Sequence, residues 1–363
     1  MESIKDLPEY AGRFNEGITY ITGYSGGGGN TLSALTKFPD YWNAGASFVG
    51  ISDYGFAEPD GWYFNGAGGR TRILDEDIGV RTSNDPDVID RYHARASNLA
   101  SKNNPYSEIY LFANDNESIS PNINNTSFRD NAIVAESFPG EFDNITFING
   151  QSGVEYQGPG NPIDWVDWNN DGIQQSDELQ NFPHSTALAV QERGERWFLD
   201  DLLAGDIQQP VLNDSDELYV AGFVRTRPFQ VFLGDGQNAA ADLFYSLDSD
   251  ELVFELDIAS LNKAITGELT IYENRLSTSQ ALIELNGTII GQTELFDGYV
   301  YEGLSDGDRL RFLAVPEAAT IGLICTGGVS LMCYRPRRTT RCSQRCMCSH
   351  SRFKRVRRCF RHR

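Results

Sequence analysis

The chain has 363 residues, enough for one large or two medium domains with a sizeable core. Its formal net charge is −21, but residues 335–363 hold 12 of the 30 Lys and Arg residues and no Asp or Glu. Residues 1–334 therefore carry a formal charge of −33, which excludes nucleic acid and anionic membranes as partners of the folded body and favours bound cations. All six cysteines lie in the last 39 residues, so no disulfide framework holds that body.

The first predicted elements form a strand, helix, strand unit. Residues 18–24 read as a buried strand, residues 27–37 as a helix, and residues 44–51 as a second strand. A helix between two strands implies that the strands pair in parallel. Further strands are expected at 108–113 and 144–148, with a helix near 126–136 between them.

The later part of the chain has a different pattern of apolar residues. Residues 184–203 carry apolar side chains at helical spacing. After Gly205 the sequence consists of short alternating runs such as ELYVAGFV, LVFELDI and GELTIYE, separated by Asp, Gly and Asn. This pattern predicts an antiparallel β domain over residues 206–314.

The turn between the first strand and the first helix reads Gly23-Tyr24-Ser25-Gly26-Gly27, which fits the nucleophile-elbow pattern G-x-S-x-G. Such a turn would expose the Ser25 hydroxyl above the sheet, at the positive end of a helix. It would also aim the backbone N–H of Gly26 at a developing oxyanion. The alternative is a flexible glycine loop; the flanking strand and helix favour the elbow.

With these residues the chain resembles α/β-hydrolases of the prolyl oligopeptidase type, which are serine peptidases. The likeness lies in residues 17–55 around the elbow, and it extends to RYHARAS at 91–97 and EIYLFANDNESISP at 108–121. It covers residues 1–205 and implies a partial α/β-hydrolase domain: a parallel sheet with flanking helices. Several strands normally precede the elbow in this family, whereas 17 residues precede the strand here, so we expect either a piece of a longer protein or a catalytically impaired remnant.

The resemblance leaves the acid of the catalytic triad open. Aligning the family's acid loop on Pro121 places the acid at Glu117, aligning it on Ile119 places Asn116 there, and Asp115 is adjacent. Asp115 or Glu117 could orient a histidine and stabilise imidazolium, which an asparagine could not do. The alternative is a solvated acidic loop.

Two histidines precede the basic tail, His93 and His184. The chain order in this fold is Ser, acid, His, with the histidine just before the final helix. His184 stands there and is the candidate general base, with a surface residue at a helix start as the alternative. His93 precedes the acid loop and is interpreted as structural.

An EF-hand-like loop, DWNNDGIQQSDE, spans residues 167–178 within an insertion near 164–180. It matches the pattern D-x-[DN]-x-[DN]-G-x5-E, in which alternate residues turn oxygens towards a hard cation and glycine makes the sharp bend. The loop predicts a structural calcium site that orders the segment carrying His184; the alternative is an Asp/Asn-rich turn. The predicted ligands are Asp167, Asn169, Asp171, the carbonyl of Ile173, and Glu178.

Residues 315–338 combine Val-Pro-Glu, an apolar run over 318–334 and an arginine cluster. This segment resembles the PEP-CTERM sorting signal of Gram-negative bacteria, although Ala318 replaces the usual second proline. The resemblance implies a membrane-anchoring helix, cleavage by an exosortase-like enzyme, and a place in the cell envelope or on the surface. No signal peptide is recognisable in MESIKDLPEY, and residues 339–363 are expected to be a disordered, basic, Cys-rich tail.

Two functions therefore compete. The first is an exported serine hydrolase, a peptidase that acts on a peptide or ester through an acyl-enzyme on Ser25. The second is a non-catalytic, calcium-binding surface protein derived from a degenerate hydrolase. Sequence shows neither the substrate nor the oligomeric state.

Overall fold

A computed structural model describes residues 18–57, 60–81, 85–104, 106–113, 119–135, 144–149, 162–163, 199, 209–234, 240–248, 251–259, 265–272, 280–294 and 299–314. The chain divides into two compact units, residues 1–319 and 320–363. All the described residues belong to the first unit, which is a mixed α/β structure. The predicted domain boundary near residue 205 lies outside the described residues, as does the predicted C-terminal helix.

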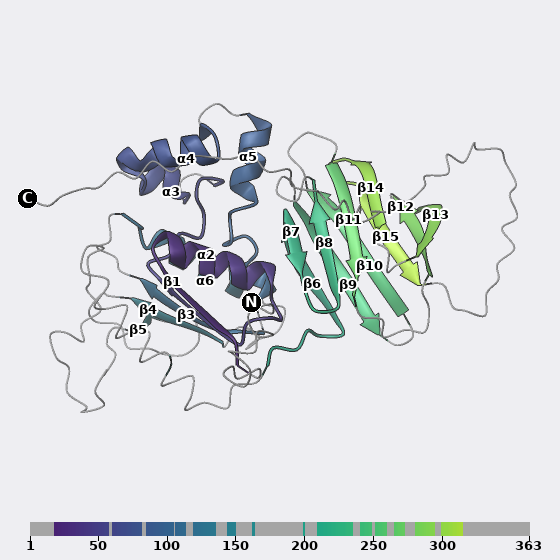
Figure 1. Cartoon of the computed structure of the whole chain (residues 1–363), viewed down its shortest axis with the longest axis horizontal. Coiled ribbons are helices and arrows are strands. Elements are labelled where there is room, and N and C mark those ends of the chain that lie inside the picture. Colours follow the sequence, from purple (N-terminus) through teal and green to yellow (C-terminus); the bar gives the residue numbers. More distant parts are fainter. Residues whose placement is uncertain are drawn as a thin grey trace, which may run out of the picture. The chain divides into compact units, whose positions relative to one another are not determined.

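The N-terminal part of this unit contains a parallel sheet (Figure 1). Its five strands lie in the order β1-β2-β3-β4-β5, and every neighbouring pair is parallel. The predicted parallel arrangement of the first two strands is therefore confirmed. The strands are β1 (Tyr20–Tyr24), β2 (Ala44–Phe48), β3 (Glu108–Ala113), β4 (Ile145–Asn149) and β5 (Pro162–Ile163).

Helices α2 (Gly26–Lys37) and α6 (Ile123–Ala135) share an apolar cluster with the sheet. Leu32 and Leu35 from α2 and Phe128 from α6 are fully buried with alternate residues of β3 and β4. The intervening residues Tyr110 and Phe112 are also buried, so β3 is covered on both faces, as strands of parallel sheets usually are.

Short helices between β2 and β3 complete this part, and the sequence analysis did not predict them. They are α3 (Trp62–Asn65), η2 (Gly68–Arg70), α4 (Thr71–Asp77), α5 (Pro86–His93) and η4 (Ser101–Asn103). α5 has recognisable signals, because Asp85 caps it by accepting from the N–H of Asp87 and Pro86 opens it. A separate cluster around Trp62, Leu74 and Tyr92 packs α3, α4 and α5 together.

The C-terminal part is antiparallel, as predicted. One sheet has the order β13-β12-β15-β10-β9-β6 and the other β14-β11-β8-β7. Their strands are β6 (Ser215–Ala221), β7 (Phe223–Arg225), β8 (Phe229–Leu233), β9 (Ala240–Asp248), β10 (Glu251–Ala259), β11 (Ile265–Ile271), β12 (Gln280–Leu285), β13 (Thr288–Glu294), β14 (Tyr299–Leu304) and β15 (Arg309–Ala314).

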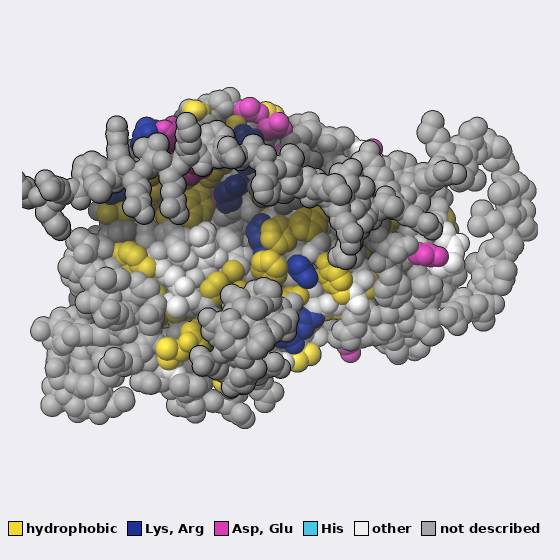
Figure 2. Space-filling view, viewed as in Figure 1, with side chains coloured by type: hydrophobic (Ala, Val, Ile, Leu, Met, Phe, Trp, Pro, Cys, Tyr) yellow, Lys and Arg dark blue, Asp and Glu magenta, His cyan; other side chains and the backbone are white. Residues whose placement is uncertain are grey.

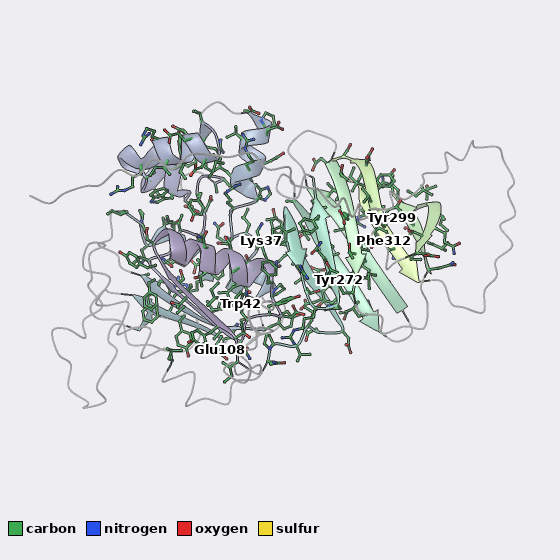
Figure 3. The ribbon with its side chains drawn as sticks, in the orientation of Figure 1. Lys37, Trp42, Glu108, Tyr272, Tyr299 and Phe312 are labelled. Carbon is green, nitrogen blue, oxygen red and sulfur yellow. The ribbon has the colours of Figure 1, made fainter. Side chains whose placement is uncertain are left out.

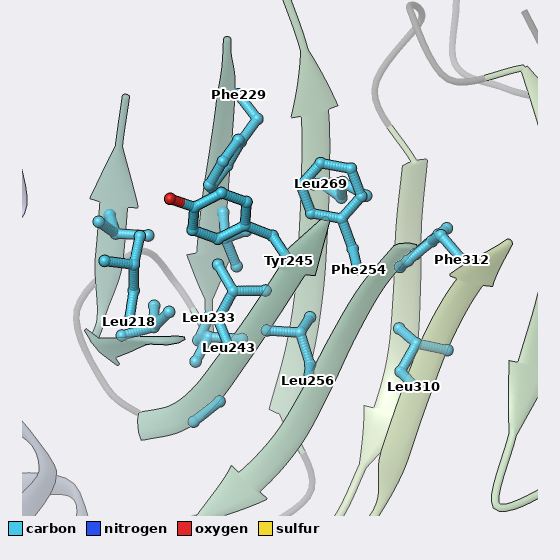
Figure 4. Packing of buried hydrophobic residues seen from close by; sticks show 14 of the residues in the cluster. Leu218, Phe229, Leu233, Leu243, Tyr245, Phe254, Leu256, Leu269, Leu310 and Phe312 are labelled. Carbon is cyan, nitrogen blue, oxygen red and sulfur yellow. The ribbon is translucent and has the colours of Figure 1, made fainter. Parts of the chain in front are cut away.

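Side chains from both antiparallel sheets form one apolar core (Figure 4). Phe254 and Phe312 from the larger sheet and Phe229 and Leu269 from the smaller one are at most 2% exposed. The ring of Phe229 packs edge-on against Phe254, with 5.0 Å between centroids. Alternation along each strand points these residues inward, so the two sheets are layers of a β-sandwich.

Candidate active site around Ser25

Ser25 lies between the end of β1 and the start of α2, in a strained backbone conformation. Its φ and ψ are 54° and −119°, a region that glycine adopts freely and other residues avoid. The N–H of Ser25 donates to the carbonyl of Phe48 on β2 at 2.8 Å, and the carbonyl of Ser25 accepts from Gly29 in α2 at 3.0 Å. The turn therefore holds a partly exposed serine in a conformation characteristic of a nucleophile elbow.

Two of the flanking glycines are required by close packing. A Cβ on Gly23 would collide with the backbone of Gly27, and one on Gly28 would lie 2.8 Å from Gly50 Cα. By contrast, a Cβ on Gly26 or Gly27 would meet nothing within 4 Å. The tight turn thus depends on Gly23 and on the contact of α2 with β2, whereas the space around Gly26 is open.

The first turn of α2 faces this open space. The N–H groups at a helix start have no acceptor within the helix, and they carry the positive end of the helix dipole. No acidic side chain lies in the first turn of α2. An oxyanion at the Gly26 amide would therefore meet a favourable field without a competing carboxylate from that turn.

The loop after β2 forms a second strained segment beside the elbow. Val49 is fully buried with a φ of 44°, and its N–H donates to the carbonyl of Phe112 at 2.7 Å. Asp53 closes the loop, because its carboxylate accepts from the N–H groups of Gly55, Phe56 and Ala57 at 2.7 to 3.0 Å. Burial raises the pKa of Asp53, and these three hydrogen bonds oppose that rise.

Tyr54 connects this loop to the elbow. Its hydroxyl lies 3.4 Å from the carbonyl of Gly26, and its ring packs edge-on against Trp62. Burial raises the pKa of the Tyr54 phenol. The sequence analysis did not single out Asp53 or Tyr54; the available signal was the Ser-Asp-Tyr-Gly turn at the end of a strand, where Asp often bonds to the following backbone N–H groups.

A buried polar network fixes the loops at the carboxyl ends of the strands. The hydroxyl of Ser52 donates to the carbonyl of Asn124 at the start of α6, and Ser97 donates to the carbonyl of Ser52 at 3.1 Å. Asn125 reaches the carbonyl of Gly50 at 3.5 Å. In open α/β sheets ligands bind outside this edge, so Ser25 and the network occupy the usual place for a site.

The predicted triad partners His184, Asp115 and Glu117 lie outside the described residues. The structure therefore does not test whether they meet Ser25. The calcium ligands predicted in residues 167–178 also lie outside the described part, and within that part no group of three or more His, Cys, Asp or Glu side chains could hold a metal ion. The predicted sorting segment 315–338 lies outside it as well; among the described helices none is long and apolar enough to cross a membrane.

His93, interpreted as structural, is buried at the end of α5. Its Nε2 is hydrogen-bonded to the hydroxyl of Tyr219 on β6, and its ring stacks on Phe56 with 4.0 Å between centroids. Burial first, and the charge of Lys37 second, lower the pKa of His93 to about 4. His93 is thus a neutral packing residue at neutral pH.

Comparisons with known proteins add little. No family model and no curated protein sequence matches the chain. Among solved structures, a crystal structure of a puromycin hydrolase mutant in complex with PGG is similar, with 18% identity and a TM-score of 0.27. The match covers 32% of this chain and 16% of that chain.

Proposed function

We propose that this protein is a serine hydrolase, specifically a peptidase of the prolyl oligopeptidase type, with Ser25 as its nucleophile. The observation that supports this proposal is the strained backbone of Ser25 at a strand-to-helix turn. Strain of this kind costs of the order of 1–3 kcal/mol and is kept where the surrounding structure and the chemistry require it. A flexible glycine loop would not need a non-glycine residue in that conformation.

The proposed reaction is an acyl transfer in two steps. The hydroxyl of Ser25 attacks the carbonyl carbon of a peptide or ester while His184 accepts its proton, and the N–H of Gly26 donates to the oxyanion. The C–N or C–O bond then breaks, and His184 returns the proton to the leaving amine or alcohol. Water then attacks the acyl carbon while His184 accepts one of its protons; the bond from the acyl carbon to Ser25 Oγ breaks, and His184 returns the proton to Oγ as the acid leaves. Asp115 or Glu117 orients the histidine.

The decisive experiment is labelling of the purified full chain with a fluorophosphonate probe, which reacts with activated serines. We expect the folded protein to be labelled, Ser25→Ala to be unlabelled, and His184→Gln to be labelled at least 100-fold more slowly. Ser33→Ala is the matched control, because Ser33 lies on the same helix and is also partly buried. Folded protein that takes no label at Ser25 would overturn the proposal and favour the non-catalytic alternative.

We further propose that the loop 167–178 binds one calcium ion, which stabilises the fold and orders the segment before His184. All five specified positions of the loop pattern support this, including Asp167 at the first and Glu178 at the last. Calcium at 100 times its dissociation constant should stabilise the protein by about 2.7 kcal/mol. The melting temperatures of the protein in calcium and in chelator measure this difference. Asp167→Ala should abolish it and Asp130→Ala, an exposed control paired with Arg129, should keep it.

A further inference from the structure

Three basic side chains gather where helices α2 and α5 end. Lys37 is the last residue of α2, His93 is the last residue of α5, and Arg95 follows two residues later. The Lys37 ammonium donates to the carbonyl of Ala221 at 2.8 Å, while His93 is bonded to the Tyr219 hydroxyl. Because Tyr219 and Ala221 are two residues apart on β6, about 7 Å, Lys37 and His93 reach the same short stretch of strand. Figure 3 labels Lys37 between α2 and β7.

Arg95 lies two residues beyond His93, and its charge acts on Lys37. Burial, and then the charge of Arg95, lower the pKa of Lys37 to about 8. Burial, and then the charge of Arg91, lower the pKa of Arg95, while Tyr54, Tyr92 and Asp77 act in the opposite sense. The positive charges of Lys37, Arg91 and Arg95 therefore repel one another near the ends of α2 and α5. Figure 2 shows basic side chains among hydrophobic ones across the middle of the same face.

No ion pair of the described residues neutralises this cluster. The ion pairs that the described residues form involve other cations, such as Lys102 with Asp242 and Arg311 with Glu255. Asp77 acts on Arg95 electrostatically, and the two are not among the ion pairs formed within the described part of the chain. A group of half-buried cations without a paired carboxylate is unexpected in a protein of net charge −21.

Helix capping explains part of the cluster. Basic residues favour the negative end of a helix, and Arg95 donates to the carbonyl of Arg91 in the last turn of α5 at 2.8 Å. The contacts found use one donor of Arg95 and one of Lys37, whose ammonium also lies 4.4 Å from the centroid of the Phe223 ring. An ammonium has three donors and a guanidinium five, so capping leaves donors on both groups for a ligand.

We propose that Lys37 and Arg95 form an anion-binding subsite that holds a carboxylate of the substrate, with His93 as its neutral wall. This inference rests on the proposed function, since it assigns the substrate class of the same site. α2 runs from Gly26 beside Ser25 to Lys37, about 17 Å at 1.5 Å per residue. At the Gly26 end, the hydroxyl of Tyr54 lies 3.4 Å from the carbonyl of Gly26, and the phenol also acts electrostatically on Arg95. The preferred substrate is therefore a short peptide with a carboxylate about five extended residues from the scissile bond.

The test measures binding without turnover, in the full chain carrying Ser25→Ala. The probes are a hexapeptide of alanine and proline with a free carboxyl terminus and the same peptide as its carboxamide. We expect the free acid to bind about tenfold more tightly, as a charge-assisted hydrogen bond implies. Adding Lys37→Met should bring the two affinities to within twofold. Lys102→Met is the matched control, because Lys102 is partly buried near Tyr219 yet paired with Asp242, and it should keep the difference.

A second variant, Lys37→Arg, keeps the test valid if Lys37→Met does not fold. In the parent the preference for the acid should fall as the pH rises above about 8, because Lys37 loses its proton. Lys37→Arg stays charged, so its preference should persist at pH 9.5. Equal binding of acid and amide by the parent, no binding of either, or a preference that survives Lys37→Met would overturn the subsite. Fluorophosphonate labelling of Ser25 is measured separately, so failure of the hydrolase proposal and failure of the subsite are distinguished.

Discussion

The α/β part and the β-sandwich of this protein differ in what they bury. With the exception of Thr226, every buried polar residue among those described lies before residue 145. Asp53, Asn124 and Ser52 are almost completely enclosed in the α/β part, whereas the sandwich interior consists of aliphatic and aromatic side chains. Burying a polar group costs stability unless it is hydrogen-bonded. The α/β part therefore depends on hydrogen bonds such as those of Asp53 and Ser52, whereas the sandwich is stabilised by apolar burial.

Backbone strain is distributed in the same way. Among the described residues, three non-glycine residues have positive φ: Ser25, Val49 and Asn286. Asn286 stands with Gly287 in the two-residue turn between β12 and β13, where such angles are the ordinary hairpin geometry. Ser25 and Val49 have no such turn to explain them, and both lie at the carboxyl ends of parallel strands. We therefore assign the proposed site to the α/β part and treat the sandwich as a framework.

The largest effect should come from the sandwich core. Phe254→Ala removes a fully buried ring packed on Phe229, and it should lower the free energy of unfolding by about 3–5 kcal/mol. Urea unfolding measures the loss. If the sandwich is a framework only, the fraction that remains folded should label with the fluorophosphonate probe at the parental rate. A specific loss of labelling would instead give the sandwich a part in the site.

The next effect depends on pH and involves His93, which bridges the two parts. In the fold its pKa is lowered to about 4, whereas in the unfolded chain it is near 6.5. Between these values the unfolded chain binds a proton that the folded chain does not, so stability falls as the pH falls through this window. Tyr219 and Phe56 contact the ring, and Lys37 acts on it electrostatically as a positive charge; none of the three offers a carboxylate to stabilise the cation.

The His93→Gln variant keeps a polar partner for Tyr219 but cannot titrate. Its stability should change less between pH 6.5 and 4 than that of the parent, by about 2–3 kcal/mol after allowance for the residual exposure of the ring. Chemical unfolding at a series of pH values gives the difference between the two curves. Parallel curves would show that His93 becomes charged without penalty, and that the α/β part and the sandwich are not joined through a dry contact.

The smallest effect should have the opposite sign. Ser25→Gly relieves the positive φ, and because glycine also makes the unfolded chain more flexible, the net gain should be about 1 kcal/mol. Ser33→Gly, in the interior of the same helix, should instead lose about 0.5 kcal/mol. Melting temperatures of both variants and the parent decide this. A destabilised Ser25→Gly would show that the elbow is not strained and would weaken the contrast with the hairpin turn at Asn286.

Local patterns were sufficient to locate many of the elements. The apolar runs at 18–24, 44–51, 108–113 and 144–148 gave four strands of the parallel sheet, because fully buried strands need continuous apolar sequence. Gly-Tyr-Ser-Gly-Gly predicted the turn, and the close approach of Gly23 to the backbone of Gly27 shows why a glycine is needed at its first position. The small helices of residues 62–93 were not predicted, since short helices have too few residues to show a period and depend on tertiary contacts such as Trp62 against the loop.

By itself, then, the sequence determined the strand, helix, strand unit with Ser25 at its turn, and the alternating pattern of the later strands. These features follow from steric and hydrophobic rules that act between near neighbours in the chain. Only the tertiary structure decided that Val49 is strained, that Asp53 closes the loop and Tyr54 reaches Gly26, and that Lys37 and His93 both bond to β6. Such contacts join residues up to 184 positions apart, and their energies depend on burial and charge that no local pattern records.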